Sequence, residues 1–319
     1  MSEKRILLTG ATGFIGQAVY PELLRQGYEI VCTTRYPERA RENHPSKTWV
    51  KMDVSEPDTV RKAMDGIDTV FYLIHSMSSG EGYKEREKKA ARNLRDGAEK
   101  SGVERVIYLG GVAPDGEVSD HLESRLRTGE ILRSGTYSVI ELRAAMILGQ
   151  GSASWQIVRD LAARLPIMIL PSWTQSRSQP VFVDDVVEAL VGAIELEGVD
   201  SEWFDIPGPD VLTVEEILRR TARKLGNNPY QLRVPLLTPK LSSYWLRFVT
   251  RSNLYLAREL VEGLKTDLLA EDDRYWDLIG YENRTPFEDA VEITLRRSEQ
   301  VPLLAGLYER SVNYLSPSD

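Results

Sequence analysis

Three glycines near the N-terminus have a spacing that suits the binding of a phosphate group. They occupy positions 10, 13 and 16 in the stretch TGATGFIG, directly after an apolar run at residues 6–8. Gly10 permits a tight turn, Gly13 lets a pyrophosphate approach the backbone, and Gly16 lets the next helix pack closely on the strand. The unpaired N–H groups and the dipole of that helix attract an anion. The order strand, turn, helix therefore predicts nucleotide binding, with a purely structural turn as the alternative.

The residue after the second predicted strand bears on which dinucleotide is bound. Residues 28–34 (YEIVCTT) form that strand, and Arg35 stands at its end. An acidic side chain there holds the ribose 2′-hydroxyl of NAD, whereas an arginine accommodates the 2′-phosphate of NADP. Arg39 follows at the start of a predicted helix and can assist. The sequence therefore favours NADP(H) over NAD(H), and a plain surface role for Arg35 is the alternative.

Alternating strands and helices must hold these residues in place. Apolar runs predict strands at residues 6–8, 28–34, 48–52, 68–75, 105–109, 139–142 and 203–206, with helical patterns between them. This alternation predicts a parallel, doubly wound sheet of the Rossmann type with right-handed crossovers. Ligands of such sheets bind beyond the carboxyl ends of the strands.

Two residues at predicted strand ends are further candidates for ligand contact. Asp53 follows the third strand, where its carboxylate can accept a hydrogen bond from an adenine amino group; a structural turn is the alternative. His75 ends the fourth strand and is expected near the nicotinamide ribose, as a cofactor contact or, less expected, as a catalytic group.

Polar residues in front of helical patterns predict where four of the helices begin. The predicted caps are Ser55, the pair Asp184 and Asp185, Thr213, and Thr285 with Glu288 as a capping box.

The chain is expected to form a nucleotide-binding core and a smaller lobe. The core comprises residues 1–150 and continues over about 181–228. Residues 151–180 and 229–319 are expected to form a mainly helical lobe on the substrate side, with helices over 239–249 and 255–264. The predicted fold class is thus an α/β Rossmann-type sheet with a mainly helical C-terminal lobe.

Composition excludes several classes of partner. A net charge of −8 argues against nucleic acid. The single cysteine, Cys32, excludes an intramolecular disulfide framework and indicates a reducing cytoplasm.

No segment approaches the roughly 18–20 apolar residues of a membrane span. The three histidines fall in separate elements, so no metal site is predicted. We expect a cytoplasmic protein with a small-molecule partner, and a homodimer stays open.

Several motifs together resemble the extended or atypical short-chain dehydrogenases/reductases, including the NmrA-like and epimerase/dehydratase-like groups. They are TGATGFIG, Asp53, the pair Gly110 and Gly111 after the fifth strand, VFVDDVVEAL and FDIPGPDVLTVEEI. The resemblance covers about residues 4–225 and implies an NAD(P)-dependent oxidoreductase. The cofactor contacts expected from it and from the strand ends are Gly10, Thr12, Gly13, Phe14, Ile15, Gly16, Arg35, Arg39, Asp53, Val54, Leu73, Ile74, His75 and Gly110.

The resemblance also implies a catalytic tyrosine with a lysine four residues later, and this chain departs from that pattern. No tyrosine has lysine four positions on, and the matching place reads HLESR, residues 121–125. By the resemblance, His121 exchanges a proton with the substrate, which an imidazole with an ordinary pKa of about 6.5 can do, and Arg125 holds the ribose. Alternatively, His121 is a polar residue at a helix start, and Arg125 lies on a solvated face with Arg127 and Glu130.

Two functions are consistent with these features. The first is an NADP(H)-dependent oxidoreductase acting on a small, fairly apolar carbonyl or quinone-like substrate. The second is a regulator or assembly factor that binds NADP(H) without turnover, and the absence of the tyrosine–lysine pair favours it.

Overall fold

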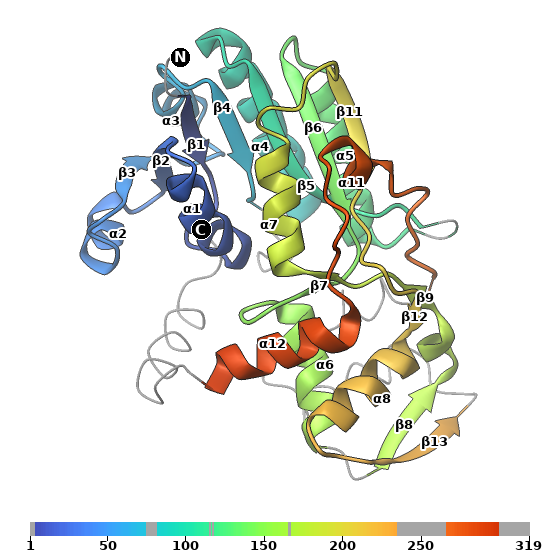
Figure 1. Ribbon diagram of the computed structural model, residues 1–319. Coiled ribbons are helices and arrows are strands. Elements are labelled where there is room, and N and C mark those ends of the chain that lie inside the picture. The colour runs from blue at the N-terminus through green and yellow to red at the C-terminus, as the bar shows by residue number, and fades with distance from the viewer. Residues whose placement is uncertain are drawn as a thin grey trace.

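A seven-stranded parallel sheet lies at the centre of the protein in the computed structural model (Figure 1). The structure describes residues 4–74, 82–114, 116, 118–164, 167–234 and 266–299. The strands are β1 (Arg5–Leu8), β2 (Glu29–Thr34), β3 (Thr48–Lys51), β4 (Thr69–Tyr72), β5 (Arg105–Gly111), β6 (Ser138–Ala144) and β11 (Ser201–Asp205). Their order is β11-β6-β5-β4-β1-β2-β3, so the chain reverses direction across the sheet between β1 and β4.

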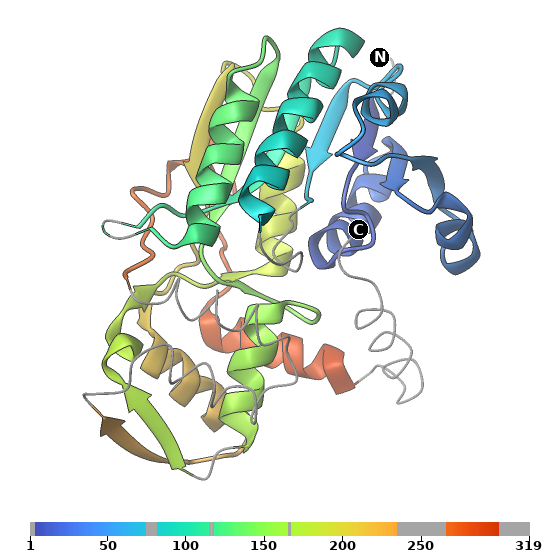
Figure 2. The same ribbon diagram turned by 180° about the vertical axis from the view of Figure 1, so that it is seen from behind.

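Helices cover both faces of this sheet. One face carries α1 (Phe14–Arg25) and α7 (Val183–Gly192), and the other carries α3 (Pro57–Ala63), α4 (Tyr83–Ser101) and α5 (Asp120–Arg133), as Figures 1 and 2 show from opposite sides. The short α2 (Pro37–Asn43) connects β2 to β3. The predicted doubly wound, Rossmann-type α/β fold is confirmed.

Burial on both faces explains why the strands are almost continuously apolar. In β5, Val106 and Tyr108 pack in the cluster under α4 and α5, whereas Ile107 and Leu109 belong to the cluster under α1 and α7. Cys32 in β2 is fully buried, and this burial raises the pKa of its thiol to about 11.

A second, largely helical group lies beyond the carboxyl ends of the strands (Figure 1). It contains α6 (Ala153–Arg164), α8 (Val214–Lys224), α12 (Phe287–Glu299) and a pair of parallel strands, β8 (Ile167–Pro171) and β13 (Tyr230–Val234). Shorter elements are β7 (Ile147–Leu148), a 3₁₀ turn at Ser172–Gln175, β9 (Arg177–Ser178), β10 (Val181–Phe182), β12 (Leu212–Thr213) and α11 (Arg274–Leu278). The expected helical C-terminal region is present, while the helices predicted over 239–249 and 255–264 lie outside the described residues.

Helix starts were predicted with mixed success. Thr213 caps α8, and its hydroxyl and the Glu216 carboxylate form a capping box. Ser55 is not the cap of α3, which begins after Glu56; its hydroxyl donates to Asp53 at 2.7 Å instead. The nearer carboxylate of Asp53 therefore outcompetes the helix end for this hydroxyl.

The caps expected at Asp184, Asp185 and Thr285 are also wrong. Helix α7 starts after Phe182, so both aspartates lie in its first turn. Asp185 is fully buried and accepts hydrogen bonds from the Thr285 hydroxyl and backbone N–H, both at 2.9 Å. A tertiary contact between residues 100 positions apart thus replaces two local caps.

Candidate functional site

The loop between β1 and α1 needs glycine at two of its three glycine positions. Gly10 has a φ of +64°, and a Cβ built on it would lie 2.9 Å from the Leu73 carbonyl oxygen. A Cβ on Gly16 would lie only 2.2 Å from the Gly10 carbonyl oxygen. The loop therefore folds back on itself and on the end of β4 more closely than any side chain allows.

The N-terminus of α1 fits a bound pyrophosphate. Its N-cap is Gly13, which is exposed; no side chain of the described residues caps the helix, and the first turn carries no acid. The N–H groups at the start of a helix have no partner within it, so here they are available to an anion. The side chains of Phe14 and Ile15 pack on an apolar cluster that includes Phe287, Ala290 and Val291 of α12. Thr12 is half-buried beside them.

A buried threonine joins this loop to β4. The Thr9 backbone N–H and hydroxyl both donate to the Phe71 carbonyl, at 3.0 and 2.9 Å, and the hydroxyl oxygen accepts the Leu73 N–H at 3.1 Å. Because Leu73 turns toward Thr9, β4 ends at Tyr72 rather than at the predicted residue 75. Leu73 and Ile74 are half-buried, and His75 lies outside the described residues.

Arg35 follows β2 at the same edge of the sheet. Its side chain is half-buried, and its guanidinium carbon lies 5.7 Å from the centre of the Tyr36 ring. Arg39 is exposed in α2, one turn further on. Both cations therefore lie on the β2–β3 side of the glycine loop, where the adenosine half of a dinucleotide binds in this fold.

Asp53 lies at the end of the neighbouring β3. One of its carboxylate oxygens accepts the N–H and hydroxyl of Ser55, at 2.8 and 2.7 Å, so the side chain holds a turn. The Val54 carbonyl accepts the Asn93 amide at 2.8 Å. The structural role foreseen for Asp53 is present, and its second carboxylate oxygen makes no hydrogen bond within the described residues.

On the other side of the loop, Arg125 reaches from α5 to the end of β5. Its guanidinium donates to the Leu109 carbonyl oxygen and lies 5.7 Å from the centre of the Tyr108 ring. The Tyr108 hydroxyl donates in turn to the Arg125 carbonyl at 3.1 Å. The alternative of a solvated face is wrong for Arg125, although Arg127 and Glu130 do form an exposed pair at 2.6 Å.

His121 stands half-buried in the first turn of the same helix. Lys84 of α4 binds Asp120 and Glu123, both at 2.6 Å, and these contacts raise the pKa of its ammonium group. One turn further, the buried Ser124 hydroxyl donates to the buried Glu87 carboxylate. The turn that carries His121 is therefore fixed on α4.

A buried cluster of charges lies next to Arg125 and was not predicted. Glu141 in β6 is fully buried, accepts a hydrogen bond from Arg143 at 2.8 Å and pairs with Arg133. A Cβ on Gly110 would lie 3.1 Å from one Glu141 oxygen, and one on Gly129 would lie 2.2 Å from the other. Gly129 thus makes room for the Glu141 side chain, and Gly110 lies close to it as well. The signal in the sequence was the lone acid within an apolar strand.

Asp205, at the end of β11, extends this cluster. Burial raises its pKa from an ordinary 3.8 to about 6, although the Glu271 N–H, at 2.8 Å, and nearby Arg143 act in the opposite direction.

Replacing Asp205 with asparagine is expected to change how stability depends on pH. Because folding raises the Asp205 pKa, the folded protein binds this proton more tightly than the unfolded chain. Asp205 therefore contributes roughly 2–3 kcal/mol to the free energy of unfolding below about pH 4. This contribution is lost as the pH rises past about 6. Urea unfolding at about pH 4 and pH 7.5 measures this contribution. Relative to the wild type, the variant should have a higher free energy of unfolding at pH 7.5 than at pH 4. The same difference between variant and wild type at both pH values would contradict the raised pKa of Asp205.

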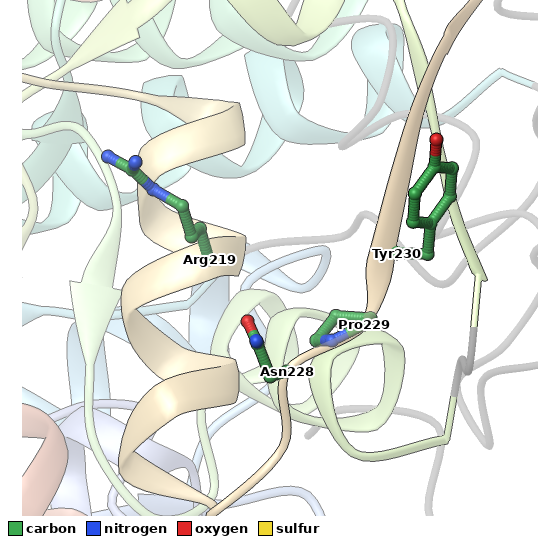
Figure 3. A pocket seen from close by; sticks show the side chains of 4 residues that line it. All are labelled: Arg219, Asn228, Pro229 and Tyr230. Carbon is green, nitrogen blue, oxygen red and sulfur yellow. The ribbon is translucent and has the colours of Figure 1, made fainter.

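Two hollows on the surface lie away from the strand ends. One of about 280 Å³ is lined by Arg219, Asn228, Pro229 and Tyr230, between α8 and β13 (Figure 3). The other, of about 590 Å³, lies at the start of α12. Neither hollow is lined by a residue of the glycine loop. The candidate site is therefore defined by the glycine loop and the strand ends rather than by either hollow. Within the described residues there is no metal-binding group of His, Cys, Asp or Glu, and no helix there could span a membrane.

This chain is similar to several known proteins. A family model described as NAD(P)H-binding matches residues 10–162. A photosystem II assembly factor of Synechocystis sp. is 21% identical over 263 residues, which are 76% of this chain and 74% of that protein. The structure of Citrobacter sp. triphenylmethane reductase complexed with NADP(H) has a TM-score of 0.74 at 17% identity and covers 91% of this chain and 99% of its own.

A further similar structure carries the other dinucleotide. MoeE5 in complex with UDP-glucose and NAD has a TM-score of 0.69 at 19% identity and covers 93% of this chain and 100% of its own. One of these two structures thus contains NADP(H) and the other NAD.

Proposed function

We propose that the chain is an NADP(H)-dependent oxidoreductase of the atypical short-chain dehydrogenase/reductase type, because an NAD(P)H-binding family model matches residues 10–162 and the fold is shared with reductases and epimerases. The observation that carries the proposal is the uncapped N-terminus of α1, with exposed Gly13 at the point where the strand order reverses. Open α/β sheets bind ligands at that point. A bound nicotinamide would supply the hydride chemistry, and the protein would supply binding and orientation.

The strand order supports a proposal for which side of the site binds each half of the cofactor. The N–H groups of Phe14 and Ile15 hold the pyrophosphate at β1. Arg35, assisted by Arg39, and Asp53 lie toward β2 and β3 and hold the adenosine half. Gly110, Arg125 and His121 lie toward β5 and α5, beside the nicotinamide half.

The substrate enters from the side of the helical lobe. The described residues of the proposed lobe, 151–164, 167–180, 229–234 and 266–299, lie beyond the carboxyl ends of the strands, where they would shield the reacting atoms from water. A fairly apolar carbonyl or quinone-like compound fits such a site, and the similarity to a triphenylmethane reductase supports an apolar substrate. We place the protein in the cytoplasm.

Replacing Arg35 with alanine is expected to weaken NADPH binding by about 10- to 100-fold, the loss of a charged hydrogen bond, and to leave NADH binding unchanged. Isothermal titration of both dinucleotides with the wild type and the variant measures this. Equal affinity of the wild type for NADPH and NADH would refute the proposed preference.

A non-catalytic role is the second candidate. It is favoured by the absence of a tyrosine with lysine four residues on, and by the similarity to an assembly factor. Oxidation of NADPH in the presence of a panel of aldehydes and quinones separates the two functions. Tight NADPH binding without oxidation by any of them would favour the regulator.

A further inference from the structure

The side chain that reaches the end of β5 is fixed in position and permanently charged. The Arg125 guanidinium is bonded to the Leu109 carbonyl, and the Arg125 backbone is bonded to the buried Tyr108 hydroxyl. The guanidinium carbon lies 5.7 Å from the centre of the Tyr108 ring. A guanidinium has five N–H donors, so the bond to Leu109 leaves further donors for a ligand.

The strand beneath Arg125 offers no side chain of its own. Gly110 and Gly111 end β5, and a Cβ on Gly111 would lie 2.9 Å from a Leu122 methyl and 3.8 Å from the Arg125 side chain. The missing side chain at Gly111 leaves room for the Leu122 methyl group of α5, and the strand end beside Arg125 carries no hydroxyl donor of its own.

An arginine at this place limits which carbonyl can be reduced. Guanidinium keeps its proton at any physiological pH, so it stabilises negative charge without acting as an acid. Hydride addition to an isolated ketone leaves a localised alkoxide, which needs a proton during the step. Hydride addition to the conjugated carbon of an enone or a quinone, rather than to its carbonyl carbon, leaves an oxyanion delocalised over several atoms, for which a fixed cation is sufficient.

We propose that Arg125 binds the substrate oxygen as an anion, and that the substrates are conjugated carbonyl compounds such as enones and quinones rather than isolated ketones. This rests on the proposed oxidoreductase function. A hydride, which carries the electron pair of the broken C–H bond, passes from NADPH to a conjugated carbon of the acceptor. NADPH thereby becomes NADP⁺. The C=O π pair ends on the oxygen beside Arg125, and water supplies the proton when the product leaves.

Ionisation of 4-nitrophenol tests the anion site without turnover. Its phenolate is a delocalised oxyanion that absorbs visible light. With the wild type saturated with NADP⁺, we expect bound nitrophenol to ionise at least one pH unit below the free compound. Arg125→Ala should abolish this shift, whereas Arg127→Ala, which removes an exposed arginine on the same helix, should retain it. No shift in the wild type, or a full shift in Arg125→Ala, overturns the proposal.

Calorimetry on the same samples separates this inference from the proposed function. If NADP⁺ does not bind, the oxidoreductase itself is refuted. If NADP⁺ binds and nitrophenol keeps its ordinary ionisation, only the anion site fails.

Steady-state kinetics provide an independent measurement. We expect kcat/KM for a quinone or an enone to exceed that for a saturated ketone at least 100-fold, with little change between pH 6 and pH 9, because the guanidinium does not titrate in that range. A comparable rate with saturated ketones, or a loss of activity above pH 7 that follows one titrating acid, contradicts the proposal.

Discussion

Replacing Glu141 with glutamine is expected to lower the free energy of unfolding by about 3–5 kcal/mol, the usual cost of removing one partner from a buried ion pair. Glu141 is fully buried and compensates Arg133 and Arg143 together. Burial lowers the pKa of both guanidinium groups, and for Arg133 the positive charge of Arg143 lowers it further, so each depends on a nearby negative charge. A neutral amide cannot compensate two cations.

Urea unfolding of the wild type and the variant measures this loss. Glu130→Gln is the matched control, because Glu130 pairs with Arg127 at the exposed surface of the same region; it should cost less than about 1 kcal/mol. A loss of that small size in Glu141→Gln would mean that water reaches the cluster, and would contradict its burial.

Replacing Gly16 with alanine is expected to weaken NADPH binding by at least about 100-fold, or roughly 3 kcal/mol. The new Cβ would lie 2.2 Å from the Gly10 carbonyl oxygen and 2.8 Å from the Ala11 Cα, both backbone atoms that have no room to move. The loop must open, which displaces the N–H groups of α1 and also destabilises the fold. Calorimetry and thermal unfolding measure the two effects.

Gly13→Ala is the informative companion variant. Its Cβ would meet one atom, the Gly10 carbonyl oxygen, at 3.2 Å, and Gly13 is exposed. We expect this variant to unfold near the wild-type temperature. Its affinity for NADPH should nevertheless be lower than that of the wild type, because the new methyl group occupies the space through which the pyrophosphate approaches the backbone. Normal NADPH affinity in Gly13→Ala would show that the cofactor does not lie against this loop.

The sheet could be predicted from the sequence because its signals are local. Apolar strands alternate with helical patterns, and Gly10 and Gly16 are required by the turn that contains them. Arg35 could be identified as a candidate because it directly follows a strand. The predicted caps failed where a distant residue competes for the same group, as Thr285 does for Asp185.

The rest of the candidate site depends on how α5 is oriented. The sequence identified His121 and Arg125 by position, but it gave no means of telling a solvated arginine from one that bonds to the Leu109 carbonyl. The grouping of Glu141 with Arg133 and Arg143 depends on the space left by Gly129, a contact between a helix and a strand. Such groupings follow from tertiary packing, which no local pattern encodes.

A crystal structure of the protein grown with NADP⁺ tests the central claim most directly. We expect the pyrophosphate within about 3 Å of the Phe14 and Ile15 N–H groups. The 2′-phosphate should contact Arg35, and the nicotinamide should lie beside Gly110 and Arg125. A dinucleotide bound away from the glycine loop, or one lying in reverse with its nicotinamide at Arg35, would contradict the account.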